Sequence, residues 1–295
     1  MIKVKRRKFF SGLLGLMGVT GAMVQGNQTT AQVRREIEVS NPEAFFRNIG
    51  SNRTLKFISP HYNLSELSPE LNWANAFMEE DFDGYGLVIS GVENLSLVGA
   101  NPTASLISLE AGYPNVITFR NCRNITIANI EAGHWPKKSF CSGSVFSFVD
   151  CDNIILDQCI LFGCGIYGIL AQNSSNFQVK GSTIKECTYG IMALQSLTNL
   201  LVEDCQFYHN ESYDTMLRAT NIRGDVRFKT CQFFENSITD YNPNNNYFFW
   251  FGDEGSSIVV ENSTIANNEF INLSNDSNRV KLVESTVENN TGGGP

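Results

Sequence analysis

A short motif recurs from residue 124 onward: a polar residue, usually asparagine, precedes three residues of which the first and third are apolar. Its starts are Asn124, Asn153, Asn176, Asn199, Asp225, Ser257 and Arg279. Consecutive starts lie 29, 23, 23, 26, 32 and 22 residues apart. A repeat of about 20 to 50 residues is typical of solenoids, whose units bury their apolar faces only by stacking. The spacing therefore predicts a chain built from stacked coils.

Two more columns follow each motif. Six residues after its start come Ile130, Cys159, Ser182, Cys205, Cys231, Ser263 and Ser285, and two residues later come Ala132, Leu161, Ile184, Phe207, Phe233, Ile265 and Val287. A spacing of two places both columns on the inward face of one strand. A third apolar stretch precedes several motifs, at 145–148, 168–170, 190–194, 248–251 and 270–273. Each coil is thus expected to hold three short parallel strands.

A turn column lies three residues beyond the apolar one. It contains Trp135, Cys164, Cys187, Asn210, Asn236, Asn268 and Asn290. Asparagine tolerates left-handed backbone geometry, and its amide can bond to the equivalent residue one coil away. We therefore expect an asparagine ladder.

The N-terminal end of the solenoid is expected to carry a cap. Ser40 or Asn41 can cap a helix, Pro42 suits its first position, and Phe45 and Ile49 help to form an apolar stripe. Residues 65–85 fit neither period and are expected to form a surface excursion.

The ladder resembles the pectate-lyase-like superfamily of right-handed β-helices. The segment from Gly133-His134 to Cys164-Gly165-Ile166-Tyr167-Gly168 resembles a bacterial branch of β-helix repeat proteins, and the likeness covers roughly residues 36–290. The resemblance implies an all-β, single-stranded right-handed parallel β-helix, for which we count about eight or nine three-strand coils and a short N-terminal capping helix. The superfamily includes lyases, hydrolases, epimerases and non-enzymes, so the fold leaves the chemistry open.

Residues 1–31 have the pattern of an export signal: a basic start, an apolar stretch over 9–24 and small residues near Ala31. Arg6-Arg7 before Phe9 resembles a twin-arginine signal, and an ordinary secretory signal is the alternative. No later segment approaches the roughly 20 apolar residues of a membrane helix. We expect a periplasmic or secreted protein whose working domain is 32–295, without membrane insertion after signal removal.

Charge disfavours nucleic acid as a partner. The chain has 22 Lys and Arg against 30 Asp and Glu, and loss of the signal removes five cations, which changes the net charge from −8 to 17 − 30 = −13. Phosphate backbones are bound mainly through Lys and Arg. An anionic polysaccharide is disfavoured for the same reason, and a neutral glycan suits the charge better.

Eight cysteines in an exported chain raise the question of disulfides. Cys159, Cys205 and Cys231 share an inward column with serines, which favours small buried thiols. Bridges between Cys164 and Cys187 or between Cys122 and Cys151 are the alternative. Zinc-type Cys-x-x-Cys pairs do not occur, and we expect neither a metal nor a cofactor.

Three residue sets are candidates for a site. Glu186, His209 and Glu235 precede the turn column on three successive coils and are candidates for acid–base catalysis, unless they simply form a solvated edge. His134, Trp135, Lys137 and Lys138 are predicted to form an outward patch that binds substrate, the alternative being a loop packed by its tryptophan. Arg218 and Arg227 are predicted to share a substrate-binding face with Glu203 and Asp204, near Tyr241, Trp250, Asp253 and Glu254.

These features predict an exported protein that binds or processes a polysaccharide of the cell envelope or environment. If it is an enzyme, it would be a polysaccharide lyase or a glycoside hydrolase. The alternative is a non-catalytic scaffold for an envelope protein, with an exposed aromatic patch at residues 247–250.

Overall fold

The computed structural model describes residues 34–101, 103–135, 142–163, 165–240 and 242–292. The expected export signal therefore lies outside the described residues, as do Lys137, Lys138, Cys164 and Tyr241. No helix within the described ranges is long and apolar enough to cross a membrane.

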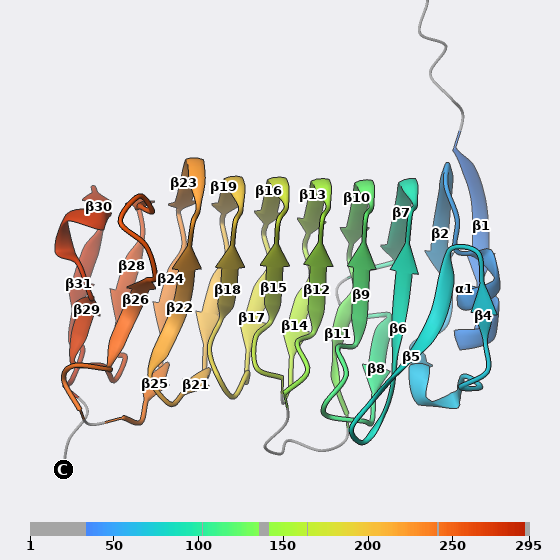
Figure 1. Cartoon of the computed structure of the whole chain (residues 1–295), viewed down its shortest axis with the longest axis horizontal. Coiled ribbons are helices and arrows are strands. Elements are labelled where there is room, and N and C mark those ends of the chain that lie inside the picture. The colour runs from blue at the N-terminus through green and yellow to red at the C-terminus, as the bar shows by residue number, and fades with distance from the viewer. Residues whose placement is uncertain (1–33, 102, 136–141, 164, 241, 293–295) are drawn as a thin grey trace, which may run out of the picture. The chain divides into compact units, whose positions relative to one another are not determined.

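Three sheets of short strands form a β-solenoid (Figure 1). Sheet A contains β1 (Arg35–Val39), β2 (Arg53–Phe57), β7 (Glu93–Gly99), β10 (Arg123–Ala128), β13 (Asp152–Asp157), β16 (Ser175–Lys180), β19 (Thr198–Glu203), β23 (Arg223–Lys229), β27 (Ile258–Glu261) and β30 (Val280–Val283). Sheet B contains β3 (His61–Asn63), β8 (Leu106–Leu109), β11 (Glu131–His134), β14 (Ile160–Phe162), β17 (Thr183–Lys185), β20 (Gln206–Tyr208), β24 (Gln232–Phe234), β28 (Thr264–Ala266) and β31 (Thr286–Glu288).

Sheet C completes each coil. Its parallel strands are β6 (Gly84–Ser90), β9 (Ile117–Arg120), β12 (Phe146–Val149), β15 (Ile169–Gln172), β18 (Met192–Gln195), β22 (Thr215–Thr220), β26 (Tyr247–Phe251) and β29 (Asn272–Ser274). Two antiparallel strands, β5 (Ala76–Asp81) and β4 (Asn72–Trp73), extend it beyond β6. A small pair, β21 (Glu211–Ser212) and β25 (Ser237–Ile238), lies between sheets B and C in the chain.

Within the described residues, the chain makes about seven complete turns, from β7-β8-β9 to β27-β28-β29. An earlier turn through β2, β3 and β6 is interrupted by the excursion, and β30 and β31 form an incomplete last turn. The predicted parallel β-helix is confirmed. The expected eight or nine coils include these two irregular turns.

The asparagine ladder of the turn column is confirmed, and it is buried. The amide of Asn210 donates to Asn236 Oδ1 (2.9 Å), that of Asn236 to Asn268 Oδ1 (2.8 Å), and that of Asn268 to Asn290 Oδ1 (3.0 Å). Each amide also donates to a strand carbonyl, as Asn236 does to Phe207 (2.9 Å). These side chains therefore supply the hydrogen bonds that buried backbone carbonyls cannot obtain from water.

The asparagines that start the motifs form a second ladder, at the edge of sheet A. Asn94 donates to Asn52, Asn124 to Asn94, and Asn153 to Asn124, over 2.7 to 2.8 Å. All four have left-handed φ values, between 55° and 59°. The repeat predicts the position of this column from Asn124 onward, but it does not predict the side-chain hydrogen bonds or the extension to Asn94 and Asn52.

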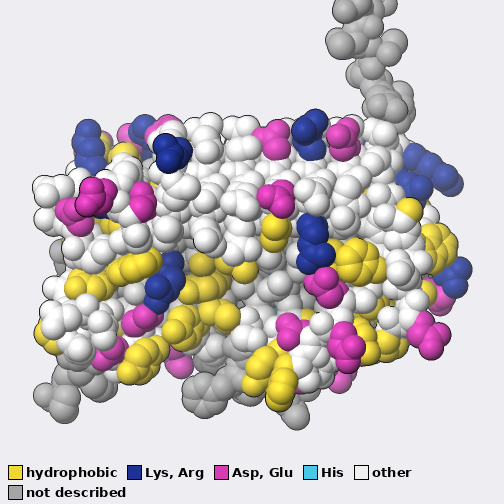
Figure 2. All heavy atoms as spheres, viewed as in Figure 1, with side chains coloured by type: hydrophobic (Ala, Val, Ile, Leu, Met, Phe, Trp, Pro, Cys, Tyr) yellow, Lys and Arg dark blue, Asp and Glu magenta, His cyan; other side chains and the backbone are white. Residues whose placement is uncertain are grey.

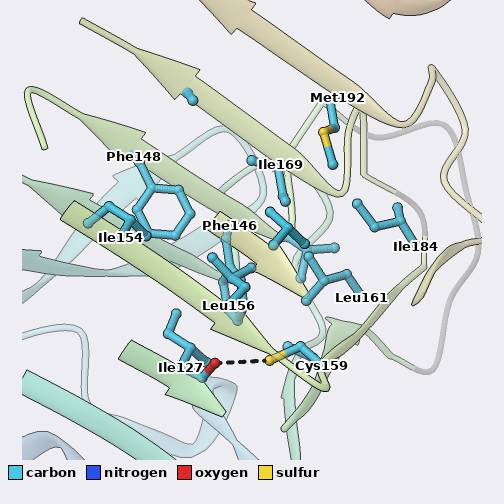
Figure 3. Close-up of a cluster of buried hydrophobic side chains, with 14 of the residues drawn as sticks. Ile127, Phe146, Phe148, Ile154, Leu156, Cys159, Leu161, Ile169, Ile184 and Met192 are labelled. Atoms are coloured by element: carbon cyan, nitrogen blue, oxygen red, sulfur yellow. Dashed lines mark hydrogen bonds between the residues drawn. The ribbon is translucent and has the colours of Figure 1, made fainter. Parts of the chain in front are cut away.

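The prediction of small, buried thiols is confirmed for the inward column of cysteines and serines. Cys122, Cys151, Cys159, Cys205 and Cys231 are buried and unbridged, so the alternative disulfide between Cys122 and Cys151 is not formed. The Cys159 thiol donates to Ile127 O (3.3 Å) inside a cluster of aliphatic and aromatic side chains (Figure 3). Burial raises the pKa of Cys159 to about 12, which keeps it a neutral thiol.

The expected cap is helix α1 (Pro42–Asn48). Asn41 accepts a hydrogen bond from Ala44 N (2.8 Å), and Phe45 packs on Phe57 with ring centroids 5.0 Å apart. The excursion contains a short 3-10 helix, η1 (Leu64–Glu66), and then β4, which pairs with β5, and β5, which also pairs with β6. A second 3-10 helix, η2 (Ser277–Arg279), precedes β30.

Replacing Asn236 by Ala should lower the free energy of unfolding by about 2 to 4 kcal/mol, because it leaves Asn210, Phe207 and Asn268 with unpaired buried groups. The matched control is Gln232→Ala at an exposed position of β24, expected to stay within about 0.5 kcal/mol of wild type. Urea unfolding followed by circular dichroism measures both. Equal stabilities for the two variants would contradict the role of the buried ladder.

Candidate functional site

Glu186, His209 and Glu235 do form a row, at the corner that follows β17, β20 and β24. All three have left-handed φ values of 54° to 57°, because this residue turns the chain out of sheet B. His209 Nε2 lies 2.6 Å from Glu235 Oε2, and both side chains are more than half exposed. The predicted row is therefore assembled on an open surface. Its role in acid–base catalysis stays a prediction.

Aromatic side chains accompany this row on the outer face of sheet B. Tyr208 stacks on Phe234 with centroids 5.0 Å apart, and Tyr208 also meets the His209 ring edge-on. Glu131 lies on the same sheet. Burial raises its pKa; the charge of Lys185 opposes this shift and that of Glu186 adds to it. Sequence reasoning missed Glu131 because its column otherwise looks like ordinary strand surface.

The predicted outward position of His134 is wrong. Its side chain is buried at the end of β11, 2% exposed, and Nε2 donates to Pro114 O (3.0 Å). Nδ1 is buried and has no hydrogen-bond partner among the described residues. Burial lowers the pKa of His134, although the Pro114 carbonyl and Asp83 oppose the shift. Trp135 is half exposed. Of the predicted patch, Trp135 therefore lies at the surface, whereas His134 lies inside the molecule.

Arg218 and Arg227 do not share a face, contrary to the prediction. Arg227 lies on sheet A and forms ion pairs with Asp225 (3.1 Å) and Glu261 (2.9 Å). Arg218 lies on sheet C. Nine residues separate the two in sequence, and the corner between β22 and β23 carries them to different sheets.

The aromatic patch predicted at residues 247–250 is also wrong. Phe248 and Phe249 are completely buried and pack against Phe233. Only Tyr247 and Trp250 are partly accessible. The run of aromatic residues thus belongs largely to the core of the β-solenoid.

Arg218 is the centre of a partly buried polar and aromatic cluster. Its Nη2 donates to Asp214 Oδ2 (2.5 Å), and its guanidinium lies over the Trp250 ring, 5.0 Å from the centroid. Tyr167 is buried beside it and meets the Tyr189 ring edge-on at 6.1 Å.

The electrostatics of this cluster keep the arginine charged and the phenol neutral. Burial acts to lower the pKa of Arg218, but Tyr167 and Asp214 outweigh it, so the pKa is raised. Burial raises the pKa of Tyr167 to about 12, against the opposing effect of Arg218. At neutral pH the cluster therefore contains one cation, one carboxylate and uncharged aromatic rings.

Exposed aromatic residues recur in the loops that lead from sheet B to sheet C. Tyr113 precedes β9, Tyr189 precedes β18 and Tyr213 precedes β22, and these side chains are 36%, 37% and 60% exposed. Figure 2 shows hydrophobic side chains gathered across the lower half of this face, with acidic and some basic side chains among them. These tyrosines belong to the first, fourth and fifth complete turns, while Tyr167, which precedes β15 on the third turn, is buried.

Uncharged polar groups complete the outer face of sheet C. Gln172 donates to Gln195 (3.0 Å), and Thr220 follows in the same register. Two cavities, of about 360 and 280 Å³, lie beside the cap and the excursion, and a small hollow of about 40 Å³ lies at the β5, β6 and β9 end of sheet C. The face of sheet C is thus an open platform rather than an enclosed pocket.

Residues 115–294 match the family model described as "Right handed beta helix region". The chain belongs to this family. The match also confirms the predicted handedness and the resemblance to β-helix proteins. No curated protein matches this β-helix chain.

Solved structures extend the fold comparison. A pectate lyase from Paenibacillus sp. 0602 is similar with a TM-score of 0.58 at 10% identity, covering 88% of this chain and 78% of its own. A pectate lyase variant from Xanthomonas campestris gives 0.55 at 14% identity, covering 90% and 83%. Bsp165PelA, from Bacillus sp. N165 and solved with trigalacturonate, gives 0.50 at 14%, covering 90% and 86%. At these identities the similarity shows the fold alone.

The buried His134 should make the stability of this β-helix depend on pH. Because its pKa is lowered on folding, it contributes stability that is present above the ordinary histidine pKa of about 6.5 and is lost as pH falls. His134→Gln should therefore lose less unfolding free energy than wild type between about pH 7.5 and about pH 5. Urea unfolding at both pH values measures the difference. Equal losses in both proteins would refute the assignment.

Proposed function

We propose that this protein binds an extended polysaccharide along the outer face of sheet C. The observation that carries the proposal is the aromatic row of the loops between sheets B and C, together with Arg218 stacked on Trp250. Aromatic faces pack against the apolar faces of sugar rings, and arginine donates several hydrogen bonds in a fixed geometry. The platform therefore offers both kinds of contact that a sugar chain needs.

The repeat suits a polymer. Neighbouring parallel strands lie about 4.8 Å apart, so the loops that present Tyr189 and Tyr213 on adjacent coils form a series of contacts along the stack. A linear chain of sugars can meet this series with successive units. A carbohydrate is also the ligand of one structural neighbour, the Bacillus pectate lyase solved with trigalacturonate. The scaffold alternative depended on an exposed aromatic patch, whose Phe248 and Phe249 are buried in the core.

Replacing Trp250 by Ala should weaken polysaccharide binding about tenfold, because it removes the ring under Arg218. Trp73→Ala is the matched control: Trp73 is 47% exposed and lies under Arg47 at 5.8 Å, but beside the cap. Affinity electrophoresis in gels that contain soluble glycans measures both. Because Trp73 lies in β4 at the antiparallel end of sheet C, an equal effect of the two substitutions would refute binding at the parallel strands.

The working location is proposed to be the periplasm or the outside of the cell. The support is the pattern of residues 1–31, with Arg6 and Arg7 before the apolar stretch. Replacing both arginines by lysines should stop export through a twin-arginine route, while an ordinary secretory signal should still work. Cell fractionation with N-terminal sequencing of the exported protein distinguishes the two. Protein found uncleaved in the cytoplasm before any substitution would contradict export.

A further inference from the structure

Sheets A and C differ in how many charged residues their strands contain. The eight parallel strands of sheet C contain two arginines, no lysine and no acidic residue. The strands of sheet A contain nine cations: Arg35, Arg53, Lys56, Arg123, Lys180, Arg223, Arg227, Lys229 and Lys281. The face proposed to bind the polysaccharide thus carries far fewer cations than sheet A.

Both arginines of these strands are already paired. Arg120 donates to both oxygens of Glu79, at 3.2 and 3.0 Å. Arg218 donates to Asp214, whose side chain is only 24% exposed, so this pair is less screened by water than one on the open surface. An anionic sugar at Arg218 would have to approach the Asp214 carboxylate as well.

The remaining groups on this face are uncharged. Gln172, Gln195 and Thr220 offer amide and hydroxyl groups, and Tyr189 and Trp250 offer rings. Amides and hydroxyls both donate and accept hydrogen bonds, which matches the hydroxyl groups of sugars. A site for carboxylates would instead be expected to present unpaired arginines in bidentate geometry.

We propose that sheet C selects uncharged polysaccharides and rejects polyuronates, because Asp214 neutralises Arg218 while leaving it in place over Trp250. Arg218 acts there as a donor to sugar hydroxyls rather than as an anion receptor. This inference rests on the proposed function and adds the class of ligand to it. Within sheet C, the only acidic residues of the described strands lie in β5 at its antiparallel end, where they add to the repulsion of anions.

The test compares wild type with Asp214→Asn on two probes, a soluble mixed-linkage β-glucan or xylan and polygalacturonate, by affinity electrophoresis. Wild type should be retarded by a neutral polymer and not by polygalacturonate. Asp214→Asn leaves Arg218 unpaired and should bind polygalacturonate about five- to tenfold more tightly than wild type in about 20 mM salt, with most of the gain lost in about 200 mM salt. Glu36→Gln, which frees Lys56 on sheet A, is the matched control and should show no such gain.

The outcomes separate the two proposals. If wild type binds polygalacturonate as tightly as the neutral polymers and Trp250→Ala abolishes this, the proposed surface stands and the neutral selectivity is wrong. A folded Asp214→Asn variant without any gain also overturns the selectivity. If wild type binds neither class of polymer, the proposed function itself fails, and the selectivity fails with it. The wild-type comparison decides the selectivity even if Asp214→Asn does not fold.

Discussion

The whole structure depends on the bonds that one coil makes to the next. Backbone hydrogen bonds between parallel strands set the spacing, but they would allow neighbouring coils to slip by two residues. The buried amides of Asn210, Asn236 and Asn268 prevent this, because each is satisfied only when the equivalent asparagine lies directly beside it. Serines and thiols act similarly at another corner, as where Cys159 N donates to Ser182 Oγ (3.0 Å). Register and stability therefore come from the same side chains.

The same stacking allows unusual residues at the corners. A left-handed backbone is ordinary for asparagine or glycine, but costs other residues of order 1 kcal/mol or more. Glu186, His209 and Glu235 nevertheless adopt it, since the strands on both sides fix the turn. Functional groups can thus occupy the corner column without altering the coil. This is why the position of the row followed from the repeat alone.

The sequence predicted the features that the repeat spacing determines. It did not predict the positions of side chains whose burial depends on contacts with other elements. The strands, the inward columns and the buried asparagine ladder follow from residue spacing. His134 was misplaced because Pro114, twenty residues earlier, folds over it and accepts its hydrogen bond. Phe248 and Phe249 were misplaced because adjacent side chains of β26 both enter the core, where strand alternation would send one of them outward. The Arg218 cluster was found only in part, since its members Tyr167, Asp214 and Trp250 come from three different coils.

The corners between the sheets differ in length, and this difference separates the part of the coil that holds the stack from the part that can bind a ligand. The corners between sheets A and B are single left-handed residues followed by small buried ones, so they hold the coils at a constant spacing. The connections from sheet B to sheet C are longer and vary in length, and they present Tyr113, Tyr189 and Tyr213. Beyond the asparagine ladder at their start, these loops contribute little to the register, so the residues at their tips can change without loss of it. A binding surface that can vary in this way beside a fixed stack explains how one β-helix can serve many ligands, and why the ligand has to be inferred from the charges and rings on sheet C rather than from the fold.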